Sequence, residues 1–76
     1  MALPRVVFSI VPADGTAGWD VRRSDEELPL KHFRAKGEAF QYGRALAEQE
    51  VKNGGLSHLK VHSDIGHLEM EKTYGG

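Results

Sequence analysis

A single helix-forming stretch, Lys36 to Asn53, divides the chain into two strand-forming halves, and this feature most constrains the fold. Its apolar residues recur at spacings of three and four, so they would form one stripe along a helix. One amphipathic helix must bury its stripe against another layer, and only the flanking strands can supply that layer. The stripe consists of Ala39, Phe40, Gly43, Leu46, Ala47 and Val51.

The ends of this helix carry unequal signals. Ala35, at the expected N-cap, lacks the side-chain oxygen that a good cap supplies, although Glu38 stands where a capping box needs it. The run Asn53-Gly54-Gly55 is a strong stop signal. Gly43 lies near the centre of the apolar stripe, and we expect Trp19 to pack against it.

The first half of the chain has the pattern of a hairpin. Arg5 to Pro12 is rich in β-branched residues and ends at a proline, and Trp19 to Arg23 alternates apolar and polar residues. Ala13 to Gly18 forms the loop between them. Pairing Ile10 with Trp19 puts the large apolar groups of both strands on one side.

The second half predicts another hairpin, from Ser57 to Ser63 and from His67 to Thr73, with a turn at Asp64-Ile65-Gly66. Pairing His62 with His67 gives a consistent register. Val61 then faces Leu68 and Leu59 faces Met70 on one side, while Lys60 faces Glu69 and His58 faces Glu71 on the other.

Together these segments predict an α+β fold of two layers, with one helix on an antiparallel sheet of four to five strands. The element order is β-β-(β)-α-β-β, in which Leu30 to Phe33 extends the second strand or forms a short third one. Residues 1–76 are expected to form a single domain, because so short a chain builds one core. The predicted core is Val6, Phe8, Ile10, Trp19, Val21, Phe40, Gly43, Leu46, Ala47, Leu59, Val61, Leu68 and Met70.

Charge and composition narrow the function. Ten Lys and Arg against eleven Asp and Glu give a net charge of −1, which argues against avid binding of nucleic acid through its phosphates. The absence of cysteine excludes a disulfide framework. Met1 to Arg5 does not resemble a signal peptide, and no apolar run could span a bilayer, so we expect a cytoplasmic protein without a membrane partner.

Several motifs together resemble one small family. They are Val11-Pro12, Gly18-Trp19-Asp20-Val21, Ala35-Lys36-Gly37-Glu38-Ala39, Arg44-Ala45-Leu46-Ala47, Leu59-Lys60-Val61-His62 with Asp64-x-Gly66, and Thr73-Tyr74-Gly75. Their order and spacing are similar to those of the bacterial domain of unknown function 2188 family. The resemblance implies a bacterial or phage source and a cytosolic location, and it implies no established activity. The chain departs from that family at Ala35, where a threonine or serine is usual.

Neither a catalytic site nor a cofactor site is predicted. The serines stand in no nucleophile motif, no glycine-rich phosphate loop occurs, and a domain this small has little room for a ligand pocket. His62 and His67, with Asp64 between them, offer metal-ligand chemistry, but a solvated histidine pair is the better interpretation. We therefore expect no enzyme activity, no cofactor and no metal, with metal binding by this pair left open.

Two kinds of partner remain. A protein partner or a homodimer contact would use the uncovered face and edges of the sheet, where Val7, Val11 and Tyr74 are expected to point away from the core. The alternative is nucleic-acid binding through the open face, by analogy with the three-stranded N-terminal domains of phage-type integrases. The candidate contact residues are Arg5, Val7, Arg22, Lys31, Arg34, Lys36, His58, Lys60, His62 and His67.

Overall fold

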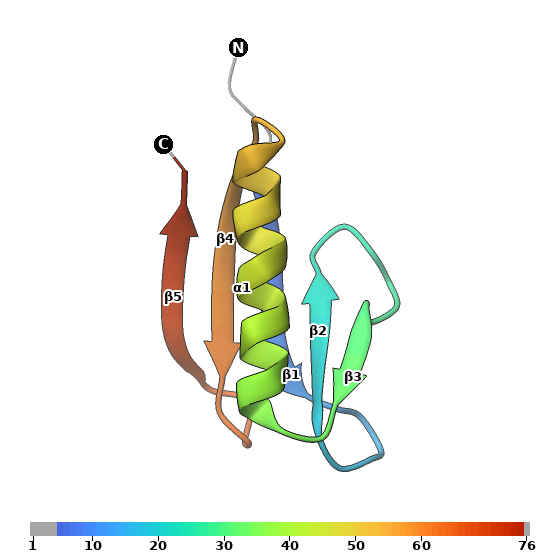
Figure 1. Cartoon of the computed structure of the whole chain (residues 1–76). Coiled ribbons are helices and arrows are strands. Elements are labelled where there is room, and N and C mark those ends of the chain that lie inside the picture. Colours follow the sequence, from blue (N-terminus) through green and yellow to red (C-terminus); the bar gives the residue numbers. More distant parts are fainter. Residues whose placement is uncertain (1–4, 76) are drawn as a thin grey trace.

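The computed structural model describes residues 5–75, which form one helix and one five-stranded sheet (Figure 1). The expectation that the N-terminus is no signal peptide rests largely on residues 1–4, which lie outside the described part. No helix within residues 5–75 is long and apolar enough to cross a membrane. The elements are β1 (Arg5–Pro12), β2 (Trp19–Arg23), β3 (Lys31–Phe33), α1 (Lys36–Lys52), β4 (Leu56–His62) and β5 (Leu68–Tyr74).

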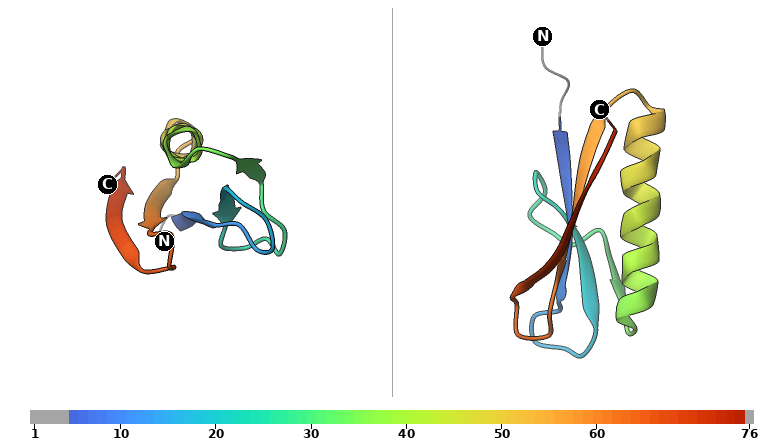
Figure 2. Two further views of the ribbon diagram at one scale, coloured as in Figure 1. Left: turned by 90° about the horizontal axis from the view of Figure 1, so that it is seen from below. Right: turned by 90° about the vertical axis from the view of Figure 1, so that its left-hand side faces the viewer.

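The predicted α+β architecture and element order are confirmed, and Lys31–Phe33 is a separate third strand. The sheet order is β3-β2-β1-β4-β5, and α1 covers one face of it, while no helix or strand within residues 5–75 covers the other, open face (Figure 2). The prediction of a wholly antiparallel sheet is wrong, because β1 and β4 pair in parallel at its centre.

The parallel pair follows from the path of the chain. The β2–β3 hairpin and α1 together lead the chain from the end of β1 back to the end of the sheet where β1 begins. Strand β4 then runs in the same direction as β1 and pairs with its free side, from Arg5 opposite Leu56 to Ile10 opposite Val61. Parallel neighbours need such a long crossover. The arrangement places β1 and β4, which carry the buried Phe8, Ile10, Leu59 and Val61, side by side beneath the helix.

The core lies between α1 and the three strands β2, β1 and β4. The fully buried apolar residues are Phe8, Ile10, Val21, Ala39, Ala47, Leu59 and Val61, with Val6, Trp19, Phe40 and Leu46 partly buried against them. The prediction that Leu68 and Met70 belong to the core is wrong, because these residues are 48% and 38% exposed. Both are on β5, the outermost strand on that side, which lies beyond the cover of the helix.

Gly43 allows the helix to approach the sheet closely. A Cβ atom at this position would lie 2.8 Å from Cδ1 of Ile10 and 3.1 Å from Cδ1 of Leu59. The expected contact with Trp19 is therefore wrong, because the central strands β1 and β4 occupy the space beside the glycine. Trp19 instead packs at the edge of the core, where the Lys36 ammonium lies 4.7 Å from its ring centroid.

The first hairpin has the predicted faces but a different register. Ile10 pairs with Val21, and Pro12 pairs with Trp19. The pairing continues further toward the loop than predicted, and the Ala13 N–H donates to the Gly18 carbonyl at 3.0 Å. A shift of two residues leaves every side chain on its original face, so the apolar pattern could not distinguish the two registers.

The predicted register of the second hairpin is wrong in a way that changes faces. The Ser63 N–H donates to the His67 carbonyl at 2.7 Å, which closes a turn one residue shorter than predicted and places Leu68 opposite His62. A bulge then adds one residue in β5, and Met70 pairs with Val61. The single-residue slip moves Leu68 to the open face, and the bulge returns Met70 to the helix side.

Helix α1 begins without a side-chain cap, as the sequence predicts. Ala35 has the extended backbone of an N-cap, with φ −102° and ψ 134°, but no side chain caps the helix there. At the other end, Asn53 and Gly54 donate their N–H groups to the last-turn carbonyls of Gln49 and Val51, and Gly54 takes φ +90°.

Replacing Ala35 with serine is expected to stabilise the domain by about 1 kcal/mol. The backbone already has the cap geometry, and Glu38 stands three residues on to complete a capping box. Urea denaturation of A35S beside the parent protein measures the effect. Because the gain needs a hydroxyl oxygen, A35V should show none, and equal midpoints for A35S and the parent would contradict the cap assignment.

Candidate interaction surfaces

The open sheet face gathers most of the predicted contact residues. On β1 and β4 the side chains that alternate with the buried ones point away from α1, and the same holds for Arg22 on β2. The structure thus brings together Arg5, Val7, Arg22, His58, Lys60 and His62. Val11 lies on this face too, half-buried like Val7.

The other four predicted residues lie elsewhere. Lys31 is on the helix side, with its ammonium 5.4 Å from the ring centroid of Phe33. Lys36 opens the helix and pairs with Glu69 of β5. Arg34 lies beside the loop before β2, and His67 lies in the turn before β5. The ten residues therefore do not form one surface.

Two acidic side chains on the open face are held by histidines. Oδ1 of Asp20 lies 2.9 Å from Nδ1 of His32, and Oε1 of Glu71 lies 3.0 Å from Nε2 of His58. The predicted contact between His58 and Glu71 is present, although it is diagonal, since His58 pairs directly with Thr73. The face therefore keeps Arg5, Arg22 and Lys60 as its strong cations.

Aromatic side chains are missing from this face. All six aromatic residues of the chain lie on α1 or pack against the core that α1 covers: Phe8, Trp19, Phe33, Phe40, Tyr42 and Tyr74. The expectation that Tyr74 points away from the core is wrong, because it pairs with Ser57, whose side chain is buried toward α1. No ring on the open face is thus available to stack on a nucleic-acid base.

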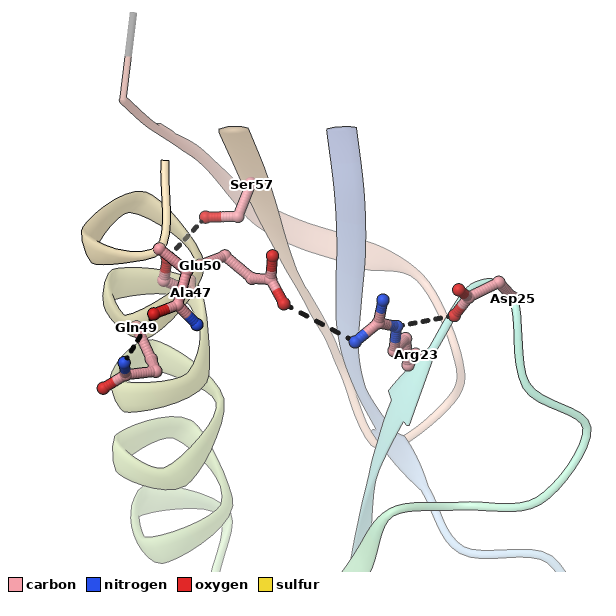
Figure 3. A network of polar contacts seen from close by, with 7 residues as sticks. Arg23, Asp25, Ala47, Gln49, Glu50 and Ser57 are labelled. Carbon is pink, nitrogen blue, oxygen red and sulfur yellow. Dashed lines mark hydrogen bonds and ion pairs between the residues drawn. The ribbon is translucent and has the colours of Figure 1, made fainter. Parts of the chain in front are cut away.

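Polar contacts near the end of α1 connect the helix to the sheet (Figure 3). The buried Ser57 hydroxyl donates to the Ala47 carbonyl at 2.7 Å and ties β4 to the helix. The Arg23 guanidinium bridges Asp25 at 2.7 Å and Glu50 at 3.5 Å. Its hydrogen bond to Asp25 raises the pKa of Arg23 above the usual arginine value. These groups serve the fold.

Strand β5 offers a second surface, which sequence reasoning did not single out. All its residues except Tyr74 are exposed, and no other strand among residues 5–75 pairs with its outer side. Exposed apolar side chains occur in its first half and in the turn before it, namely Leu68, Met70 and Ile65. The sequence pattern predicted a long strand after the helix. It could not show that this strand would be exposed, because that depends on its position in the sheet relative to the helix.

The histidine pair does not meet as predicted. His62 pairs with Leu68 rather than His67, and its Nδ1–H donates to the Gly66 carbonyl at 3.2 Å. Within residues 5–75 no group of three or more His, Cys, Asp or Glu side chains is placed to hold a metal ion.

Sequence reasoning also missed the pair formed by Asp20 and His32. Asp20 is only 7% exposed although it is charged and lies on the open face. The pair forms because β2 and β3 align these residues directly opposite each other. Alternation along β2 gave the face of Asp20, but the pairing with β3 was needed to find its partner.

Comparison with known proteins agrees with the resemblance noted in the sequence. The family model described as "Uncharacterized protein conserved in bacteria (DUF2188)" matches residues 8–74. No curated protein and no solved structure matches the chain.

Proposed function

We propose that this chain, which belongs to the DUF2188 family of uncharacterized proteins conserved in bacteria, is a non-enzymatic cytosolic module that binds an extended segment of another protein along β5. The observation that carries the proposal is the unpaired outer side of β5, a seven-residue strand. An exposed strand edge presents backbone N–H and C=O groups that an extended peptide can pair with.

The two edges of the sheet differ in what they offer. The opposite edge, β3, has only three residues, and too few backbone groups for a stable added strand. The β5 edge is longer and carries Leu68 and Met70, whose exposed apolar surface would be covered by a neighbouring strand. Binding at β5 therefore combines backbone pairing with apolar burial.

The faces of β5 define the chemistry of the partner. Met70 points to the helix side, and Glu71 points to the open side, where it is 46% exposed. A strand added beside β5 would alternate its side chains in the same way. Apolar residues would suit the helix side, next to Met70, and basic residues would suit the open side, next to Glu71. The partner is thus an extended segment in which basic and apolar residues alternate.

Charge argues against a second copy of this chain as the occupant. In a symmetric antiparallel pairing of β5 centred on Glu71, the two Glu71 side chains would stand opposite each other. In one centred on Met70, Glu69 would stand opposite Glu71. Like charges directly opposite each other destabilise a strand pair. The carboxylates thus disfavour self-pairing and favour a basic partner.

Nucleic-acid binding through the open face has weaker support. Three strong cations lie there without an aromatic ring, and the acidic groups Asp20 and Glu71 share the face. Binding through phosphate contacts alone would be weak with so few cations. This alternative is kept as an outcome of the test.

The test follows backbone amide signals of the labelled protein by NMR while a synthetic peptide of alternating lysine and valine is added. We expect saturable shifts centred on β5, and no such shifts with a peptide of alternating glutamate and valine. Glu71→Lys should weaken binding of the lysine peptide about tenfold, since it replaces an attractive charge with a repulsive one. Glu48→Lys on the outer helix face makes the same change in net charge and is the matched control.

Three results would overturn the proposal. The lysine peptide could leave β5 unshifted, or Glu48→Lys could weaken binding as much as Glu71→Lys, which would indicate unspecific charge attraction. Alternatively, a DNA duplex could shift Arg5, Arg22 and Lys60 while the peptide shifts nothing, which would assign the function to the open face.

A further inference from the structure

A buried carboxylate on the open face holds a histidine in one orientation. Asp20 is 7% exposed, and its Oδ1 lies 2.9 Å from Nδ1 of His32. A carboxylate only accepts hydrogen bonds, so Nδ1 of His32 carries the donated proton. The other ring nitrogen, Nε2, is then left for another group. Burying a charge is costly in a domain this small, and pairing with His32 offsets that cost.

The loop before β2 is shaped around the same imidazole ring. Gly18 takes φ +111°, and a Cβ atom there would lie 2.8 Å from Cε1 and 2.9 Å from Nε2 of His32. A side chain at this position would meet the Phe33 carbonyl oxygen, 2.5 Å from the Cβ position, as well as the ring. Asp20 and Gly18 thus fix the position of His32 from two sides.

A groove lies beside this ring, on the opposite edge of the sheet from β5. Its lining consists of Thr16, Ala17, Gly18, His32 and Arg34. The polar side chains among these are a guanidinium, an imidazole and a hydroxyl, and no carboxylate from residues 5–75 lines the groove. Arg34 is exposed and makes no ion pair with any residue from 5 to 75.

We propose that this groove binds an oxyanion, with the Arg34 guanidinium as its charged donor and the His32 ring as part of its lining. A guanidinium group gives charge-assisted hydrogen bonds to phosphate and carboxylate oxygens. Asp20 is a positioning residue, which accepts the hydrogen bond from Nδ1 of His32 and so holds the ring that lines the groove. Thr16 also lines the groove, and its hydroxyl is a group that can donate a hydrogen bond.

The experiment titrates the labelled protein with inorganic phosphate, and separately with acetate, while NMR follows the His32 ring and the amides of Thr16 to Gly18. We expect saturable shifts confined to the groove. Tighter binding of phosphate would identify a phosphate-bearing ligand, and tighter binding of acetate a carboxylate. Arg34→Gln should weaken binding about tenfold, while Arg44→Gln on the outer helix face should leave it unchanged.

Asp20→Asn separates positioning from folding. In the parent protein the nitrogen shifts of His32 should report a proton on Nδ1, and in D20N they should report a mixture of tautomers together with weaker phosphate binding. No saturable shift with either anion would overturn the proposal, as would equal weakening by R34Q and R44Q. Because the groove and β5 lie on opposite edges, this result is independent of the peptide titration.

Discussion

Phe8→Ala is expected to destabilise the domain by about 3–5 kcal/mol, enough to unfold much of it at room temperature. Phe8 lies on the central strand β1, is 2% exposed and belongs to the buried cluster beneath α1. Truncation would remove a large apolar side chain and leave a cavity that the paired strands cannot close. Urea denaturation followed by tryptophan fluorescence measures the loss, because Trp19 packs against the same cluster.

The neighbouring Val7 provides the control for that change. Val7 lies on the same strand but on the open face, where it is half-buried. Val7→Ala should cost only about 1 kcal/mol, since less apolar surface is lost and no enclosed cavity forms. Equal losses from the two substitutions would show that both faces of β1 are buried alike, contrary to the two-layer arrangement.

Gly43→Leu is expected to cost about 3 kcal/mol for the opposite reason, because the space between helix and sheet is already filled. Its first side-chain atom would lie 2.8 Å from Cδ1 of Ile10, and the further atoms of leucine would force α1 away from the sheet. Gly43→Ala should change stability little, because the gain in helix propensity offsets a small displacement of the Ile10 side-chain end.

Gly37 allows the same substitution without the crowding. It lies in the first turn of α1, and a Cβ atom there would meet nothing within 4 Å. Gly37→Leu should therefore leave the domain equally stable or more stable. Thermal melting of G43L and G37L gives the comparison. A G43L protein with the same melting temperature as the parent would mean that the helix does not pack closely against the sheet at this point.

Periodicity in the sequence was sufficient to predict the elements and most of their faces. The spacing of three and four in α1 and the alternation in β1, β2 and β4 depend on local geometry and on which side is buried. The uncapped Ala35 and the stop at Asn53-Gly54 are equally local. The α+β architecture follows from these features because one helix has only the sheet to pack against.

Strand order and register depended on information that local patterns do not contain. The parallel pair of β1 and β4 results from the crossover through α1. The slip of Leu68 results from a turn shortened by one residue, and the bulge in β5 from an extra residue that no composition signal marked. Burial of β5 was overestimated because an alternating strand looks the same whether or not a helix covers it.

The same limit explains the candidate surfaces. The open-face residues on β1, β2 and β4 could be grouped from alternation alone, whereas Lys31, Arg34, Lys36 and His67 could not be placed from charge. The pairing of Asp20 with His32 needed the register between β2 and β3. Surfaces built across strands therefore emerge only with the sheet topology.

Hydrogen exchange of the β5 amides, with and without the alternating lysine and valine peptide, tests the proposed function most directly. A strand added to this edge must form backbone hydrogen bonds with it, so outward-facing amides from Leu68 to Tyr74 should exchange more slowly in the complex. Slower exchange in β5, with β3 unchanged, is the predicted result. Binding of the peptide with unchanged exchange throughout β5 would contradict the account.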